Sequence, residues 1–392
     1  LSEGACSASA CRVLSALASA STAATSAICA MVNRIFEKED AEGVDESHAT
    51  LVVDSLRCMC HLPASAAAAC KAGLIAQAET AAASAKSRDL RHAVLSLLTG
   101  VAAVSEAARA DMRDSPIIAA AVQYIADGIK SSAKKQVGTA ALHLLLVLSQ
   151  SESLRGAIRA ASLLDSLESL CNTSSNERTK ALLLVANVYA SLLDLSSSHA
   201  GSDAAATSER VVALVTKYSI EQELTTRLSE SIRTIGQDPS GQVLGLRKSL
   251  AAVRSLATSA KLCPRLVEAG VAEALARALS TVEMHPLGAT AADLSVAADA
   301  IQRLAFVEEL RPRLLDKAVT DALSSRLSGS DQSEGGQRLE QAAKSALATL
   351  NGELDIVISN DCIDAGGVTP EKAPRYNVFI SHKRSDAQDF AR

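Results

Sequence analysis

An internal repeat constrains the fold of this sequence more than any other feature. Residues 256–280 read LATSAKLCPRLVEAGVAEALARALS, and residues 304–328 read LAFVEELRPRLLDKAVTDALSSRLS, with an offset of 48 positions and no gap. The two segments share Leu-Ala at the start, Pro-Arg-Leu in the middle, and Ala-Leu and Leu-Ser near the end. A repeat of this period predicts a stack of similar supersecondary units, because each unit buries its apolar face against its neighbours.

The better copy predicts two short helices that follow a longer one. We expect a helix to end near Leu256 and the next to begin at Pro264, because proline suits the first turn of a helix. Gly270 is then expected in the left-handed conformation that ends many helices. The second short helix carries an apolar stripe at i, i+4 and i+8, formed by Val271, Leu275 and Leu279.

Weaker copies are found upstream. Residues 148–171 align with the better copy at an offset of 108, and residues 55–84 contain Lys-Ala-Gly-Leu where that copy has Glu-Ala-Gly-Val. Further helical segments with this spacing are 11–36, 94–125, a unit opening at 181–193 and a last one opening at 342–351. The units begin roughly 40 to 48 residues apart, which is the period of armadillo and HEAT solenoids.

Composition agrees with a helical chain and excludes several other classes. The chain has 392 residues, of which 48% are hydrophobic and 2% aromatic, with no Trp. The hydrophobic content is too high for a disordered chain, and the scarcity of strand formers argues against an all-β fold. A net charge of -5 and few aromatic residues give no sign of nucleic-acid binding. No run approaches the ~20 apolar residues of a membrane span.

The cysteines and histidines give no strong sign of a metal site. The nine cysteines are scattered and odd in number, which favours reduced thiols packed in helices. Cys58-Met59-Cys60-His61 has metal-ligating residue types, but positions i and i+2 of a helix do not share a face. We therefore expect structural thiols there and no metal site, and we expect packing or surface roles for His92 and His143.

The run Leu266-Val267-Glu268-Ala269-Gly270-Val271, followed by Ala274-Leu275 and Leu279, resembles the armadillo repeat. The resemblance extends over about residues 10–350 and implies an all-α, right-handed armadillo/HEAT-like solenoid with a concave surface for protein partners. An irregular helical bundle is the alternative. Polar or Gly/Pro-rich segments predict surface loops at 37–47, 194–209, 236–245 and 328–337.

The composition changes after residue 352. Residues 352–375 contain paired glycines and two prolines and are expected to form a linker. Residues 376–381 (YNVFIS) are a short apolar run typical of a buried parallel strand. Ser385 and Gln388 then form a capping box that predicts the start of a helix. We expect the chain to be part of a longer protein, since it begins at Leu1 without Met and ends at Arg392 inside this pattern.

Residues 376–392 resemble the opening of a TIR domain, with Asn377 where the family often has aspartate. The resemblance implies a truncated α/β, flavodoxin-like domain whose family self-associates in signalling and, in some members, hydrolyses NAD. Ligands of such folds bind at the carboxyl ends of the strands. The residues expected to form the rim of a nucleotide pocket are Ser381, His382, Lys383, Arg384 and Ser385. A solvated interface loop is the alternative at these positions.

The sequence thus predicts an armadillo-like domain over 1–351, a linker over 352–375 and the start of a TIR domain over 376–392. This order resembles that of SARM-type proteins of animals, without a SAM-like segment. It implies a cytoplasmic signalling scaffold that binds proteins on its concave face and regulates a TIR domain. The alternatives are an autoinhibited NAD-hydrolysing enzyme, with NAD as substrate, and a plain armadillo binding module. No catalytic residue is expected in residues 1–392, because the family's catalytic glutamate lies later in its domain, and no cofactor is expected there.

Overall fold

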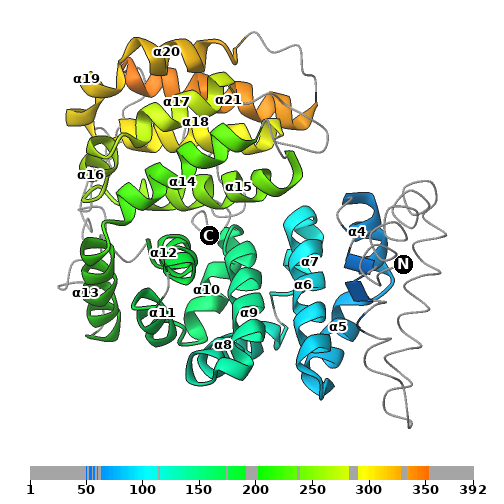
Figure 1. Ribbon diagram of the computed structural model, residues 1–392. Helices are drawn as coiled ribbons and strands as arrows, with labels where there is room; N and C mark the ends of the chain where they lie inside the picture. The colour runs from blue at the N-terminus through cyan, green and yellow to red at the C-terminus, as the bar shows by residue number, and fades with distance from the viewer. Residues whose placement is uncertain are drawn as a thin grey trace, which may run out of the picture.

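The computed structural model describes residues 50, 53–54, 56–57, 60, 63–113, 115–173, 175–190, 202–235, 239–281, 290–327 and 333–352. These residues form helices and turns, with no strand among them. The helices follow one another in chain order from α4 to α21 across a curved stack (Figure 1). The secondary structure therefore agrees with the helical class that the sequence predicts.

The described helices group into six units of three. The first helices of the units are α4 (Pro63–Lys71), α7 (Glu106–Asp111), α10 (Glu152–Ala160), α13 (Ser202–Lys217), α16 (Cys263–Glu268) and α19 (Arg311–Leu314). The second helices are α5 (Leu74–Ser84), α8 (Ile117–Lys130), α11 (Leu164–Cys171), α14 (Ile220–Thr234), α17 (Val271–Thr281) and α20 (Lys317–Ser324). The third helices are α6 (Arg88–Val104), α9 (Lys135–Leu148), α12 (Ser175–Tyr189), α15 (Pro239–Leu256), α18 (Ala291–Ala305) and α21 (Glu334–Leu350). Two short 3-10 turns, Ser132–Lys134 and Glu308–Leu310, precede α9 and α19.

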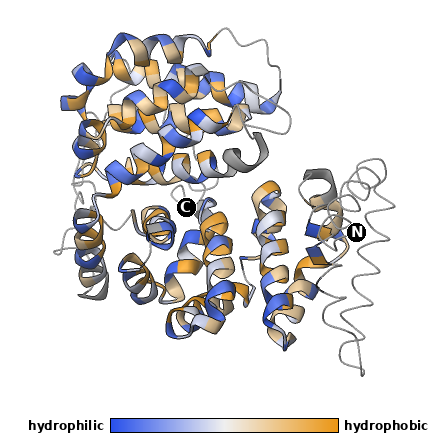
Figure 2. Cartoon of the chain, viewed as in Figure 1, coloured by the Kyte–Doolittle hydropathy of each residue, from blue (hydrophilic) through white to orange (hydrophobic). Residues whose placement is uncertain are grey.

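The third helices form the continuous inner row of the stack. Each packs on the next in the order α6, α9, α12, α15, α18 and α21. The buried apolar side chains from Val53 to Leu350 form one contiguous core, made mainly of Leu, Ala and Val. Figure 2 shows hydrophobic and hydrophilic residues alternating along the helices, as amphipathic packing requires. Small side chains let the stacked helices approach closely, which accounts for the scarcity of aromatic residues.

Polar contacts between neighbouring units recur at the spacing of the repeat. Arg265 Nε donates to Glu221 Oε1 at 3.0 Å, across 44 positions of the sequence. Arg247 donates through Nε and Nη2 to the two carboxylate oxygens of Asp293 at 2.7 and 3.0 Å, across 46 positions. Contacts at one repeat length are expected when each unit touches only its neighbours. The described residues therefore form an all-α solenoid of armadillo-like three-helix units.

The turn between the first and second helices carries a left-handed residue in four units. Gly270 has φ 80°, as the sequence predicts, and α16 begins with its proline in the first turn. Gly73 takes the same conformation at φ 82° in the first unit. In the third and fourth units the position is occupied by Ser162 at φ 56° and Ser219 at φ 45°. The left-handed turn is therefore retained in the two units that have serine in place of glycine.

Two predicted loops are partly helical, which corrects the sequence analysis. The segment 194–209 is helical from Ser202 onward, and 236–245 is helical from Pro239 onward. Serine and alanine do not break a helix. Proline is tolerated in the first turn, because the backbone N–H groups there have no hydrogen-bond partner within the helix. The earlier part of 194–209 and the predicted loop at 37–47 lie outside the described residues.

The third predicted loop, 328–337, is helical from Glu334. Ser333 caps this helix by accepting a hydrogen bond from the Gly336 backbone N–H at 3.1 Å, which offsets the weak helix propensity of the glycines. The predicted unit openings at 181–193 and 342–351 begin in third helices, as the better copy does at Leu256. Residues 181–189 are the last part of α12, and 342–350 are the last part of α21.

Candidate functional site on the inner face

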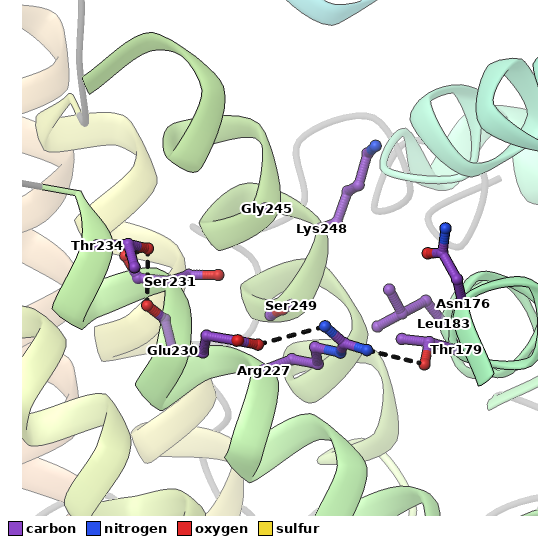
Figure 3. Close-up of a pocket in the computed structure, with 10 residues that line it drawn as sticks. All are labelled: Asn176, Thr179, Leu183, Arg227, Glu230, Ser231, Thr234, Gly245, Lys248 and Ser249. Atoms are coloured by element: carbon purple, nitrogen blue, oxygen red, sulfur yellow. Dashed lines mark hydrogen bonds and ion pairs between the residues drawn. The ribbon is translucent and has the colours of Figure 1, made fainter. Parts of the chain in front are cut away.

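A hollow of about 320 Å³ lies between α12, α14 and α15 (Figure 3). Most of the residues that line it have polar side chains, which distinguishes it from the Leu/Ala packing between other helices. The lining residues are Asn176, Thr179 and Leu183 of α12, Arg227, Glu230, Ser231 and Thr234 of α14, and Gly245, Lys248 and Ser249 of α15.

Helical periodicity brings the polar side chains of α14 to this wall. Leu224, Leu228 and Ser231 are buried at i, i+4 and i+7 and face the core. Arg227 and Glu230 lie beside that stripe and are more exposed. A polar edge therefore borders the buried stripe, and it lines the hollow.

The charge of Arg227 is neutralised by two carboxylates. Its Nε donates to Glu223 Oε1 at 3.1 Å, and its Nη1 donates to Glu230 Oε2 at 3.2 Å. Thr179 Oγ1 donates to the same Glu223 oxygen at 2.6 Å and ties the group to α12. The guanidinium and the two carboxylates thus hold one another in place.

Lys248 is the cation of the hollow that this network does not include. Its side chain extends away from Arg227 and from the dashed contacts around it in Figure 3. The side chain is half-buried, and the described residues place no carboxylate within 4.0 Å of its ammonium. Burial lowers the pKa of Lys248 to about 8, and the like charge of Lys180 contributes to the same shift. The ammonium therefore stays mostly protonated at neutral pH, although its burial and the nearby charge of Lys180 disfavour the charged form.

Two more basic side chains of the inner row lie close to Lys248. Lys180 on α12 also has a pKa that burial lowers, and nearby Glu177 partly opposes that shift. His143 is the one residue between Ala140 and Ser149 of α9 that is not fully buried. Burial lowers its pKa to about 3, and the charges of Lys248, Lys180 and His92 add to the effect. We call Lys180, Lys248 and His143 the inner basic cluster.

The cluster spans three neighbouring third helices. His143 lies on α9 and Lys248 on α15, and α12, which carries Lys180, packs between these two helices. The charge of Lys248 acts on His143, so the cluster lies on the face that the row of third helices forms.

This arrangement offers groups that can bind a polar or charged partner. The hollow offers hydroxyl and amide groups and one ammonium, whereas its carboxylate is already engaged by Arg227. Among the residues of the described ranges, no three His, Cys, Asp or Glu side chains are placed to hold a metal ion. An anionic group is the natural complement of such a surface, because it would relieve the repulsion between Lys180 and Lys248.

The rim residues predicted from the TIR-like segment lie outside the described residues. These are Ser381, His382, Lys383, Arg384 and Ser385, and with them the whole of 353–392, including the predicted strand. The domain boundaries at 351/352 and 375/376 stay predictions for the same reason. The inner basic cluster belongs to the solenoid and is a separate feature of the chain.

The cysteine-rich segment is described only at Cys60, which is buried. No disulfide joins Cys60, Cys70, Cys171 or Cys263, and all but Cys70 are buried. Burial raises the pKa of the Cys171 thiol to about 11, so it stays protonated at neutral pH. These four cysteines agree with the prediction of packed structural thiols.

Sequence reasoning did not single out Lys180 or Lys248, and it gave His143 only a packing or surface role. Each lies among apolar residues of a third helix, as in Lys180-Ala181-Leu182-Leu183. The sequence signal that could have indicated these residues is a charged side chain next to the buried apolar stripe of a helix. The curvature that brings α9, α12 and α15 together is not visible in any single segment, so the cluster was missed.

No protein-family model and no curated protein matches this chain. Similar solved structures include the designed armadillo repeat protein YIII(Dq)4CqI, at 17% identity over 71% of this chain and 100% of that one, with a TM-score of 0.43. A designed armadillo repeat protein in complex with peptide (KR)4 is 16% identical over 71% of this chain and 99% of that one, with a TM-score of 0.41. An engineered protein covers 87% of this chain at 16% identity, with a TM-score of 0.37. The fold assignment therefore rests on the packing of the six units described above.

None of the described helices is long and apolar enough to cross a membrane.

Proposed function

We propose that the solenoid is a scaffold that binds a protein partner on its concave inner face. The observation that carries this proposal is the polar hollow between α12, α14 and α15, with Lys248 beside it outside any described ion pair. A half-buried charge without a counter-charge is costly to the free protein, and a partner that supplies one relieves that cost. A curved row of helices also presents an extended surface, which suits a peptide or a protein edge.

A screen of random displayed peptides on the full chain tests this function. Peptides that are enriched should protect backbone amides of α9, α12 and α15 from hydrogen exchange. The first helix α13 does not line the hollow, so it is the internal control and should keep its exchange rates. The proposal fails if no peptide is enriched, or if the protection falls on the first helices.

We propose further that this scaffold is a cytoplasmic signalling protein that controls a TIR domain beginning at residue 376. The support is the sequence pattern Tyr376-Asn377-Val378-Phe379-Ile380-Ser381, followed by a capped helix start. In this proposal, binding on the inner face changes the self-association of the TIR domains. Light scattering on a protein that continues past Arg392, with and without an enriched peptide, tests the link. Unchanged association at saturating peptide would leave a plain binding module.

The same segment supports a second candidate function, an NAD-hydrolysing TIR enzyme inhibited by the solenoid. Its test is the rate of NAD cleavage by the longer protein, measured before and after proteolytic removal of the solenoid. An increase after removal is the expected result. Absence of cleavage in both samples would exclude the enzyme and leave the scaffold.

A further inference from the structure

The inner face carries two lysines near each other although the chain as a whole is negative. The charges of Lys180 and Lys248 act on one another there, beside the neutral imidazole of His143, in a chain whose net charge is -5. The neighbouring carboxylates are engaged elsewhere. Glu177 pairs with Lys135 Nζ at 3.2 Å, and Glu223 and Glu230 hold Arg227.

We propose that the inner basic cluster is the docking site for an acidic, carboxylate-rich segment of a partner protein, with Lys248 and Lys180 binding its carboxylates. This inference rests on the proposed scaffold function and specifies the chemistry of the partner. Its basis is charge complementarity. The ammonium of Lys248 lines the hollow, beside the hydroxyl and amide groups of Thr179, Ser249 and Asn176. Lys180 is near enough for its charge to act on Lys248.

The size of the hollow fits one acidic side chain together with the adjoining backbone. Its volume of about 320 Å³ is many times the roughly 10 to 15 Å³ that a cavity needs to hold one water molecule. Carboxylates bound to lysines in a partly buried site form charge-assisted hydrogen bonds, which are stronger than neutral ones. The acidic segment thus gains affinity from the same charges that destabilise the free protein.

Other partners fit this surface less well. A basic peptide would meet Lys180 and Lys248 as like charges. Duplex nucleic acid requires cations spread along many phosphates, whereas this cluster is compact and lies within a net-negative chain. A small phosphate-bearing anion shares the charge of a carboxylate but would leave the row of third helices beyond the hollow without contacts.

Fluorescence anisotropy with labelled peptides tests the proposal on the full chain. The probes are a Glu-rich peptide, the same peptide with every Glu replaced by Gln, and a Lys-rich peptide. A second series measures the displacement of each bound peptide by inorganic pyrophosphate. The Glu-rich peptide should bind, and the Gln and Lys versions should bind at least about tenfold more weakly, as expected for lost charged hydrogen bonds.

Variants locate the site. Lys248→Met and Lys180→Met should each weaken binding of the Glu-rich peptide by about tenfold. The matched control is Lys261→Met, because Lys261 is exposed in the turn between α15 and α16 and carries the same charge. It should change the affinity by less than about twofold. Circular dichroism and thermal melting confirm that all three variants are folded.

The outcomes separate the two proposals. If the Glu-rich and Gln-rich peptides bind equally well, or Lys248→Met has no effect, the acidic-segment proposal is wrong while the scaffold function stands. If pyrophosphate binds more tightly than any peptide and displaces it, the site is for a small anion and the acidic-segment proposal is again wrong. If no peptide of any charge binds and none is enriched in the display screen, the scaffold function fails as well.

Discussion

At the scale of single residues, Lys248 lowers the stability of the free protein. Its folded pKa is about 8, below its ordinary value of 10.5, so the unfolded chain holds the proton more tightly. The destabilisation is complete below pH 8 and disappears as the pH rises towards 10.5. The groups facing the ammonium are Lys180 and His143, while Arg227 and Glu230 neutralise each other across the hollow.

Lys248→Met should therefore raise the free energy of unfolding at pH 7 by roughly 1 to 3 kcal/mol, since one pKa unit corresponds to about 1.4 kcal/mol. The gain should shrink between pH 8 and pH 10. Urea denaturation at a series of pH values measures both effects, with Lys261→Met as the control that shows no such trend. A gain that stays constant over this range would contradict the assignment of the pKa shift to Lys248.

His143 makes the fold sensitive to acid. Its folded pKa of about 3 lies below the ordinary 6.5, because the side chain is buried and faces Lys248, Lys180 and His92. Between these values the unfolded chain binds a proton that the folded chain does not, so stability falls as the pH drops below 6.5. His143→Gln should remove a slope of about 1.4 kcal/mol per pH unit. Denaturation curves at pH 7, 6 and 5 measure it, and a variant with the wild-type slope would exclude His143 as the cause.

At the scale of elements, the left-handed turn between the first and second helices allows a stabilising substitution. Ser162 holds φ 56° with an exposed side chain, whereas glycine adopts this conformation without steric cost. Ser162→Gly should raise the free energy of unfolding by about 1 kcal/mol. Gly270→Ser is the reciprocal change and should lower it by a similar amount, because the turn geometry is the same. Thermal unfolding of the two variants tests the pair, and a loss of stability in Ser162→Gly would show that its side chain matters to the turn.

The crossing of α8 and α9 depends on a close contact between two glycines. A Cβ atom at Gly138 would lie 3.0 Å from the Tyr124 carbonyl oxygen and 3.2 Å from the Gly128 Cα. Gly138→Ala should therefore destabilise the protein by roughly 1 to 3 kcal/mol, although alanine is the better helix former. Gly156→Ala on α10 is the matched control, since a Cβ there meets nothing within 4 Å, and it should stabilise by about 0.5 to 1 kcal/mol. Equal melting temperatures for the two variants would contradict this reading of the contact.

The same scale shows what the sequence could and could not predict. The proline of α16, the left-handed Gly270 and the stripe of α17 follow from local chemistry, and the structure confirms them. The helical starts at Ser202 and Pro239 were missed because polar composition resembles a loop until packing on a neighbour is known. The inner basic cluster was missed for a different reason. It joins α9, α12 and α15, and their convergence depends on the curvature of the whole stack.

At the scale of the whole molecule, the net charge of the chain and the charge of the inner basic cluster have opposite effects on the binding of an acidic partner. The long-range field of a chain with net charge -5 repels such a partner, whereas the inner basic cluster attracts it at short range. Salt screens charges beyond a Debye length of about 10 Å at 0.1 M, and it screens partly buried pairs much less. Raising the salt from about 0.05 to 0.2 M should therefore weaken binding of the Glu-rich peptide by less than about tenfold, unlike a phosphate-backbone interaction.

The pH dependence of the same binding identifies the group responsible. Carboxylate binding needs a charged Lys248, which loses its proton near pH 8 in the free protein, so affinity should fall as the pH rises from 7 to 9. His143, with its pKa of about 3, is neutral throughout this range and contributes no change. The peptide's carboxylates are likewise ionised throughout. In the Lys248→Met variant the remaining affinity should vary less with pH. An equally steep fall in that variant would assign the titration to Lys180 instead, and a flat profile in the wild type would show that neither lysine binds the peptide.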